Sequence, residues 1–256
     1  MHDTAMDEIA YNPSFDPDAV FEVGDYLYFY SDWLTDERAD AEVAALIALL
    51  KLEAPMHILD LACGHGRHAN RLAALGHTVI GIDRQPGFLE IARCQAADMG
   101  VNVDYHQSDM RRIDFVDEFD RVLLIFTAFG YFDDEGNLQV LRNVARALKP
   151  GGLLAFDSPS RDTFLKRQPF NVIEKDGNLL IDRDSFDPVT GRSTNRRIVI
   201  RDGVRRDKPF SIRLYSPTEV RALLDQAGLK LHGFYGGWAG TPLTSGDHRM
   251  VVVAQK

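Results

Sequence analysis

The chain is poor in cysteine and lacks both a long apolar run and an excess of basic residues. Its 256 residues include two cysteines, Cys63 and Cys94, without a CxxC pair or a histidine cluster beside them. This pattern supports neither a disulfide framework nor a zinc site, so no metal ligands are predicted. The longest apolar stretches, such as 122–126, are far shorter than a membrane span, and the acidic N-terminus has no signal-like apolar core. We therefore expect a soluble cytoplasmic protein without membrane partners.

The charge balance is acidic, with 38 Asp and Glu against 29 Lys and Arg, a net charge of −9. A binder of duplex nucleic acid needs a basic footprint to displace phosphate counterions, so that class is disfavoured. Hydrophobic residues make up 45% of the chain and charged residues 26%, as in ordinary globular proteins. The length fits one large domain or a domain with an insertion.

Short apolar strands alternate with amphipathic helices through the first 160 residues. Strands are predicted at 57–62, 77–83, 101–106, 119–126 and 153–158, and helices at 36–52, 67–75, 86–98 and 134–148. This alternation predicts an α/β fold, a parallel sheet with helices on both faces. Later in the chain, a capping box opens a helix at 217–228, and two strands follow near 229–235 and 248–254.

Residues 171–215 break this rhythm with closely spaced turn signals such as Asp176-Gly177 and Asp202-Gly203. Short alternating strands between such turns predict antiparallel hairpins. We therefore divide the chain into an N-terminal segment (1–34), an α/β domain (35–170 and 216–256) and an antiparallel β insertion (171–215).

The most informative segment is 57–69, where a short apolar strand runs into Gly64-x-Gly66 and then a helix. A glycine turn between strand and helix lets backbone N–H groups approach a nucleotide, and a Cβ there would block both the turn and the ligand. The pattern also fits the relaxed dinucleotide fingerprint, through Ala69. On its own, the glycine pattern does not distinguish a dinucleotide from another nucleotide-containing ligand.

Two acidic residues follow the next strands. Asp83 ends the strand 77–83, where its carboxylate can accept hydrogen bonds from ribose hydroxyls, and the alternative is a helix N-cap before Pro86. Asp109, in Ser108-Asp109-Met110, can accept from an adenine amino group, and the alternative is an ordinary loop aspartate.

With these residues in place, the chain resembles the class I S-adenosylmethionine-dependent methyltransferases over roughly 55–160. The matching pieces are Asp60-x-Ala62-Cys-Gly64-x-Gly66, Asp83, Ser108-Asp109-Met110, Phe119-Asp120 and the Leu148-Lys-Pro-Gly-Gly152 turn. The resemblance implies a Rossmann-like seven-stranded, mostly parallel sheet with an antiparallel last strand. It also implies that S-adenosyl-L-methionine lies across the carboxyl ends of the first four strands and leaves as S-adenosyl-L-homocysteine.

The cofactor-binding residues that the resemblance implies are Tyr26, Asp60, Ala62, Gly64, Gly66, Arg67, Asp83, Arg84, Ser108, Asp109, Met110 and Phe126. An NAD enzyme is the competing interpretation. The chain has no recognisable nicotinamide half-site, although Arg84 directly after Asp83 would suit the 2′-phosphate of a dinucleotide. We interpret the Arg84 head group as a solvated charge.

The residues after the fourth strand bear on the methyl acceptor. Phe126–Phe132 stands where enzymes that methylate base amines or glutamine amides carry an Asn/Asp-Pro-Pro-Tyr/Phe motif, and neither cysteine is placed for attack on cytosine. Together with the aromatic N-terminal segment and the hairpin insertion, this segment is similar to bacterial small-molecule methyltransferases, including those that act on amines of sugars and amino acids. In that group the N-terminal segment and the insertion close over the cofactor as a lid.

Four residues are predicted to contact the acceptor: Tyr26, Tyr131, Arg213 and Tyr215. The alternative for each tyrosine is a packing residue whose hydroxyl is satisfied locally, and for Arg213 a solvated face. Catalysis is expected to be direct in-line displacement on an amine or hydroxyl of a small molecule, dominated by positioning. A homodimer is a further expectation.

The insertion is rich in basic residues, namely Arg192, Arg196, Arg197, Arg201, Arg205, Arg206, Lys208 and Arg213. A charged hairpin edge protected against strand pairing explains them, and an anionic substrate group is the alternative. Two further functions stay open at this point: an RNA methyltransferase that uses this basic insertion, and an S-adenosylmethionine-binding enzyme of non-methyl chemistry.

Overall fold

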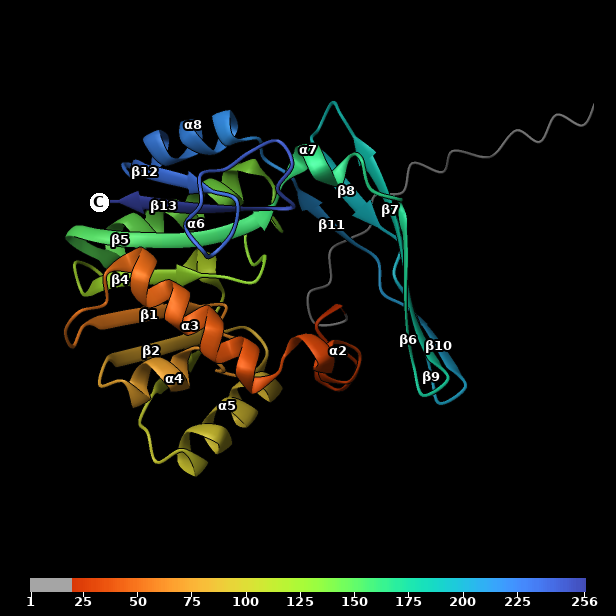
Figure 1. Ribbon diagram of the computed structural model, residues 1–256, viewed down its shortest axis with the longest axis horizontal. Helices are drawn as coiled ribbons and strands as arrows, with labels where there is room; N and C mark the ends of the chain where they lie inside the picture. The colour runs from red at the N-terminus through yellow and green to blue at the C-terminus, as the bar shows by residue number, and fades with distance from the viewer. Residues whose placement is uncertain (1–19) are drawn as a thin grey trace, which may run out of the picture.

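The computed structural model describes residues 20–256, and its centre is a seven-stranded sheet (Figure 1). The strand order is β12-β13-β5-β4-β1-β2-β3; β13 runs antiparallel to both β12 and β5, and the other neighbouring strands of this sheet are parallel. The strands are β1 (His57–Leu61), β2 (Thr78–Asp83), β3 (Asp104–Gln107), β4 (Phe119–Leu124), β5 (Leu148–Pro159), β12 (Lys230–Tyr235) and β13 (Arg249–Gln255). This order confirms the predicted Rossmann-like sheet with an antiparallel last strand.

Helices cover both faces of the sheet and create two apolar cores. The helices are α3 (Asp36–Leu50), α4 (Ala69–Ala74), α5 (Pro86–Asp98), α6 (Asp134–Ala147), α7 (Arg161–Phe164) and α8 (Pro217–Ala227). Leu46 of α3, Leu72 of α4 and Leu89 of α5 share one core, whereas α6 and α8 contribute to the other. Alternation along β1 divides its side chains between the cores, because Ile58 faces the first and Leu59 the second.

The two capped helix starts read from the sequence are confirmed. The Thr35 side chain accepts a hydrogen bond from the Arg38 N–H at 3.3 Å and begins α3. Ser216 and Glu219 form the reciprocal capping box that begins α8. Local side-chain chemistry therefore sets these two boundaries.

Several strand ends differ from the prediction, and left-handed residues explain two of them. β1 stops before Ala62 (φ 60°), and β4 stops at Leu124, ahead of Phe126 (φ 66°) and Thr127 (φ 63°). Such values leave the extended region and end the ladder. The break expected at 149–152 is instead an irregular start of β5, where Leu148 pairs with Phe119 before the register shifts.

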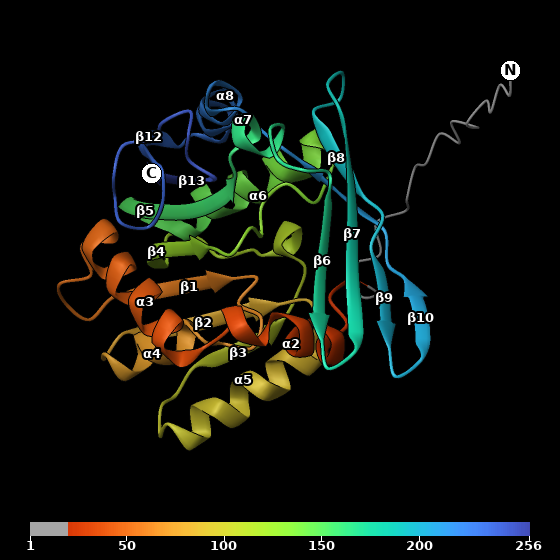
Figure 2. The ribbon, with the colours of Figure 1, turned by 45° about the vertical axis from the view of Figure 1, so that its right-hand side comes forward.

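The predicted antiparallel insertion is a second sheet beside the first (Figure 2). Its strands are β6 (Phe170–Lys175), β7 (Asn178–Asp187), β8 (Arg192–Asn195), β9 (Ile198–Arg201), β10 (Val204–Asp207) and β11 (Phe210–Arg213). Asp176-Gly177 and Asp202-Gly203 adopt left-handed conformations and close two of the hairpins, as their sequence predicts. No helix among residues 20–256 is long and apolar enough to span a bilayer.

The N-terminal helix α2 (Val23–Tyr30) packs on this insertion (Figure 2). Residues 1–19 lie outside the part of the chain that the structure describes. Phe29 shares a small core with Leu180 and Val199. A short 3₁₀ turn, η1 (Ser31–Trp33), links α2 to α3.

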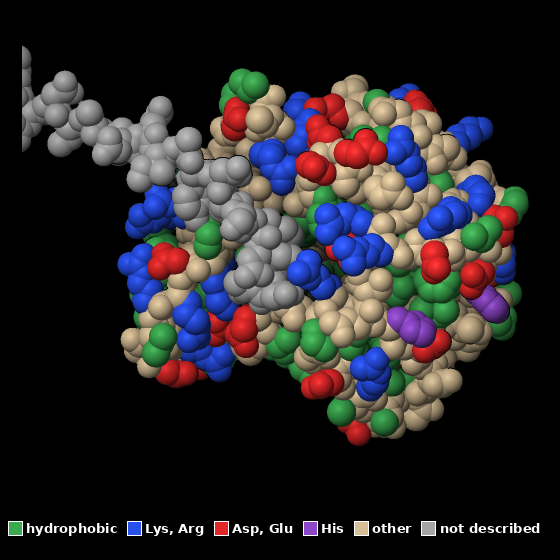
Figure 3. All heavy atoms as spheres, turned by 180° about the vertical axis from the view of Figure 1, so that it is seen from behind, with side chains coloured by type: hydrophobic (Ala, Val, Ile, Leu, Met, Phe, Trp, Pro, Cys, Tyr) green, Lys and Arg blue, Asp and Glu red, His purple; other side chains and the backbone are tan. Residues whose placement is uncertain are grey.

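Much of the basic charge of the insertion is neutralised within the molecule. Arg201, Arg206 and Lys208 converge on the buried carboxylate of Asp25 in α2, at 3.2, 3.0 and 2.8 Å. Burial raises the pKa of Asp25, but the three cations outweigh it and bring the pKa down to about 2. Arg197 likewise pairs with Asp182 at 2.8 Å. Acidic and basic side chains are interspersed over this part of the molecule (Figure 3), so these cations are largely paired within the chain.

Gly66 of the glycine turn is closely packed by its neighbours. Its N–H donates to the Cys63 carbonyl at 3.1 Å, and an added Cβ would strike the Tyr105 hydroxyl and come within 2.8 Å of the Ala92 Cβ. Gly66 (φ 75°) therefore serves packing between the turn, β3 and α5, and its role at the cofactor stays a prediction. At Gly64 (φ 55°) an added Cβ would meet nothing within 4 Å.

We predict that Gly66→Ala lowers the free energy of unfolding by about 2–4 kcal/mol, because overpacking adds to the strain of a positive φ. Gly64→Ala is the matched control, with a loss of about 1 kcal/mol from the backbone alone. Urea denaturation of both variants checks this difference. Equal losses would contradict the packing role of Gly66.

Candidate active site

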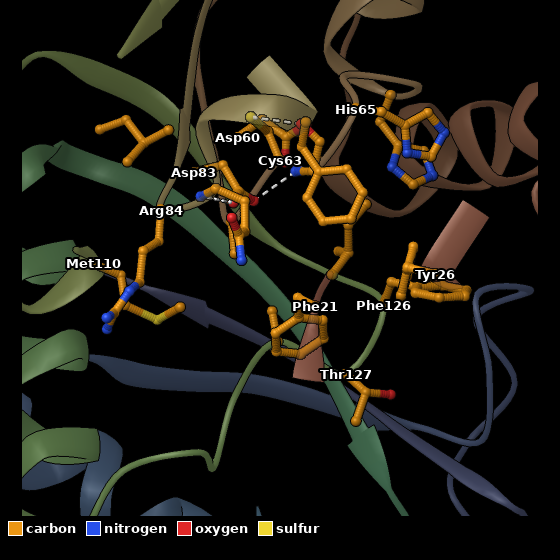
Figure 4. Close-up of a pocket in the computed structure, with 18 of the residues that line it drawn as sticks. Phe21, Tyr26, Asp60, Cys63, His65, Asp83, Arg84, Met110, Phe126 and Thr127 are labelled. Atoms are coloured by element: carbon orange, nitrogen blue, oxygen red, sulfur yellow. Dashed lines mark hydrogen bonds between the residues drawn. The ribbon is translucent and has the colours of Figure 1, made fainter. Parts of the chain in front are cut away.

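A cavity lies at the carboxyl ends of β1, β2 and β4, between the sheet and α2 (Figure 4). The predicted site residues that line it are Tyr26, Asp60, Ala62, Gly64, Arg67, Asp83, Arg84, Ser108, Asp109, Met110, Phe126 and Tyr131. Parallel strands bring their carboxyl ends to one edge, which is why residues from such distant segments meet. Gly66, Arg213 and Tyr215 are not among the lining residues.

Arg213 and Tyr215 lie under α6 and α8 instead. Arg213 donates to Glu219 at 2.6 Å and to Asp134 at 3.2 Å, and Tyr215 donates to the same Asp134 oxygen at 2.6 Å. Arg213 is 9% exposed, so the solvated interpretation is wrong as well. These two residues join the insertion to the α/β domain, and the expectation that they contact the acceptor is dropped.

Asp83 projects from the end of β2 toward the glycine turn (Figure 4). One oxygen accepts from the Gly64 N–H at 2.7 Å and the other from the Gln85 N–H at 2.9 Å. Burial raises the pKa of Asp83, and these two backbone donors oppose the shift. Each carboxylate oxygen keeps a lone pair for a further donor.

Asp60 and Arg67 bring two unsatisfied, opposite charges to the same cavity. Among the described residues, Asp60 Oδ2 and Arg67 Nη2 are buried without a hydrogen-bond partner. Burial raises the pKa of Asp60 to about 7, although the charge of Arg67 opposes it. A buried polar atom without a partner is costly unless a ligand or water completes it.

Arg67 is held from two sides. Its Nη1 pairs with Glu42 of α3, which also bonds His68 at 2.8 Å, and its guanidinium lies 4.9 Å from the centre of the Phe126 ring. The sequence analysis missed Glu42, because a helix carboxylate far along the chain gives no local signal of its partner.

Asp109 begins the 3₁₀ turn η2 (Met110–Arg112), where its side chain accepts from the Arg111 N–H at 2.9 Å. It also pairs with the Arg111 guanidinium at 2.6 Å, which lowers the pKa of Asp109. Asp109 can therefore cap the 3₁₀ turn and contact a ligand at the same time, because its side chain begins η2 and it also lines the cavity.

The α2 side of the cavity is aromatic. The Tyr26 ring lies 5.3 Å from Phe88, and Phe21 lies 6.1 Å from Tyr26 and 5.5 Å from Tyr131, between ring centres. Burial raises the pKa of both Tyr26 and Tyr131, so they are neutral phenols. The analysis of the sequence named both tyrosines but not Phe88.

His65 also lines the cavity and was not predicted. Burial lowers its pKa to about 4, and the nearby Arg67 and His68 add to this effect. Its imidazole is therefore neutral at physiological pH. The signal available in the sequence was its place between the two glycines.

Comparison with known proteins points to methyltransferases. Residues 58–152 match the family model described as a methyltransferase domain. The chain is 28% identical over 203 residues to a dTDP-4-amino-2,3,4,6-tetradeoxy-D-glucose N,N-dimethyltransferase of Saccharopolyspora spinosa, covering 74% of this chain and 78% of that protein.

Two solved structures share the fold. The CcbJ methyltransferase of Streptomyces caelestis superposes with a TM-score of 0.74 at 22% identity, covering 90% of this chain and 95% of that one. S-adenosylmethionine-bound CalS10, an amino pentose methyltransferase of Micromonospora echinaspora, gives 0.63 at 22% identity, covering 96% and 98%. With the predicted strand order and strand-end residues in place, residues 58–152 are a methyltransferase domain, and the chain is an S-adenosylmethionine-dependent methyltransferase.

Proposed function

We propose that the chain transfers a methyl group from S-adenosylmethionine to the amine of a small molecule, such as an aminosugar or an amino acid. The observation that supports an amine as the methyl acceptor is the neutral, aromatic side of the cavity. Tyr26, Tyr131 and His65 are uncharged there and none of them is a strong base. A hydroxyl acceptor needs a base, whereas an amine only has to arrive without its proton. The aminosugar N,N-dimethyltransferase and the amino pentose methyltransferase named above are similar proteins that support this choice.

The described residues fit the cofactor at both of its ends. Asp83 would accept from the ribose hydroxyls, and Asp109 from the adenine amino group. At the other end, Asp60 Oδ2 and Arg67 Nη2 are unsatisfied charges of opposite sign, which match an α-ammonium and an α-carboxylate. When bound, the cofactor supplies an electrophilic methyl on a cationic sulfur.

The N-terminal segment and the insertion would act together as a lid. Phe21 and Tyr26 come from the segment around α2 and line the cavity, while Asp25 ties the same helix to three cations of the insertion. Closure would exclude water from the acceptor and complete its contacts.

Incubation with S-adenosylmethionine and matched acceptors tests the function. We expect S-adenosylhomocysteine, measured by mass spectrometry, with a nucleotide-linked 4-aminosugar and not with its 4-hydroxyl analogue. Its rate of formation should rise with pH until the amine is fully neutral. Asp83→Ala is the control and should weaken cofactor binding by about 1.5–3 kcal/mol. Equal turnover of the amine and the hydroxyl analogue would overturn the proposed acceptor.

The affinity for S-adenosylhomocysteine should depend on pH through Asp60. Its pKa is about 7 in the free protein, and an adjacent ammonium favours the ionised form, so binding below pH 7 must release a proton. Calorimetry should therefore show affinity rising from pH 5.5 to 8, by up to about tenfold per pH unit below 7. Asp60→Asn should bind more weakly and show a flat profile. A pH-dependent Asp60→Asn profile would assign the proton to another group.

Asp60 has the opposite effect on the stability of the free protein. Its folded pKa lies above the unfolded value near 4, so the native state holds the extra proton between these limits. Its contribution to stability therefore falls as pH rises from about 4 to about 7.

The lid should be visible in hydrogen exchange. S-adenosylhomocysteine should slow exchange of the α2 amides, because Tyr26 lines the cavity. Asp25→Asn should speed exchange of the same amides in the free protein, since three cations would then face a neutral amide. Arg205→Met is the matched control, because exposed Arg205 pairs with Asp207 and not with Asp25. Identical exchange in all four samples would show that α2 is not a lid.

A further inference from the structure

The turn after β4 has an unusual backbone. Phe126 (φ 66°) and Thr127 (φ 63°) are both left-handed, and they are the only adjacent non-glycine residues with positive φ among residues 20–256. A β-branched residue such as Thr127 is strongly disfavoured in this region. Both residues line the cavity, on the side of Phe21 and Tyr26 (Figure 4). Strain that persists at a cavity wall must be held by the surrounding structure.

Asp157, near the end of the neighbouring strand β5, holds this turn. Its Oδ1 accepts from the Phe126 N–H at 2.6 Å, and its Oδ2 accepts from the Thr127 N–H at 3.1 Å. Arg249 of β13 pairs with Oδ2 and balances the charge. The Asp157 side chain is fully buried, and it does not line the cavity. It therefore reaches any ligand only through the turn.

The turn after β4 also supports the side chain of Arg67. The Phe126 side chain lies beneath the Arg67 guanidinium, 4.9 Å from its carbon to the ring centre. Glu42 holds the Nη1 side of that guanidinium, while Nη2 is the buried donor without a partner among the described residues. A change in φ at Phe126 would move its ring and release one of the two supports of Arg67.

We propose that Asp157 is a positioning residue for methyl transfer: by holding Phe126 and Thr127 in left-handed conformations, it aims Arg67 at the carboxylate of the bound cofactor. This rests on the proposed function, in which Arg67 binds that carboxylate. The role requires a carboxylate, because only an acceptor with two free oxygens satisfies both N–H groups.

Two probes separate positioning from general structural support. S-adenosylhomocysteine carries the amino-acid end that Arg67 would bind, whereas 5′-methylthioadenosine keeps the adenosine and thioether and lacks that end. In Asp157→Asn the amide nitrogen faces one of the two N–H groups. We expect its Kd for S-adenosylhomocysteine to rise by about tenfold, and its Kd for 5′-methylthioadenosine to stay within about twofold of the unmodified chain.

A second substitution tests the backbone directly. Glycine adopts positive φ without strain, so Thr127→Gly in the Asp157→Asn background should restore most of the lost affinity for S-adenosylhomocysteine. Asp120→Asn is the matched control, because Asp120 also accepts a backbone N–H, from His57 at 2.9 Å, and pairs with Lys149 at 3.0 Å at the opposite end of β4.

Equal weakening of both probes, or no weakening of either, would overturn the role of Asp157. If Asp157→Asn does not fold, Phe126→Leu tests the same link, because it removes the ring beneath Arg67 while keeping Asp157. It should weaken S-adenosylhomocysteine selectively, and unselective weakening would overturn the proposal. Failure of the unmodified chain to bind either probe would instead overturn the cofactor site itself, and the inference with it.

Discussion

The burial of carboxylates at one edge of the sheet is the constraint on which the site depends. Asp60, Asp83 and Asp157 end or nearly end three strands, β1, β2 and β5, and burial raises the pKa of each. Asp83 and Asp157 recover hydrogen bonds from two backbone N–H groups each, and Asp157 also gains Arg249. Asp60 keeps one oxygen unsatisfied. At this edge Asp157 therefore shapes the backbone, Asp83 shapes it and keeps lone pairs for a ligand, and Asp60 has an oxygen left for one.

The α2 interface contains another buried carboxylate, and this one is surrounded by cations. Asp25 alone faces three cationic side chains, with Glu22 more distant from Lys208 at 3.7 Å. Asp202 also pairs with Arg201 at 3.7 Å, so the three cations face three carboxylates, of which Asp25 is the buried one. On the proposed function, α2 would open as part of the lid without disturbing the two main cores, because its apolar core around Phe29 is small and separate from them.

Features encoded locally were predictable from the sequence, and features that join distant segments were not. The glycine turn, Asp83, the Thr35 cap and the Ser216 capping box each need only a few neighbouring residues, and the structure has them. Glu42, Asp157 and Asp25 gave no signal, because their partners lie on other elements. The prediction for Arg213 was wrong for the same reason. Alternation along the strand placed its side chain outward but could not show that Asp134 and Glu219 cover that face. The packing of Gly66 against Tyr105 likewise joins distant segments and gave no signal in the sequence.

On the proposed function, the aromatic wall also explains how the site works without a base. Direct transfer to a neutral amine moves one positive charge from sulfur to nitrogen, so the charge inside the cavity is the same before and after. Aromatic faces attract a cation at either position without forming a fixed ion pair, and Phe21, Tyr26 and Tyr131 can serve both. A carboxylate on this wall would hold the amine in its protonated, unreactive form. The wall and the charges of Asp60 and Arg67 are thus complementary: the charges fix the cofactor, and the absence of a carboxylate among Phe21, Tyr26 and Tyr131 keeps the acceptor amine nucleophilic.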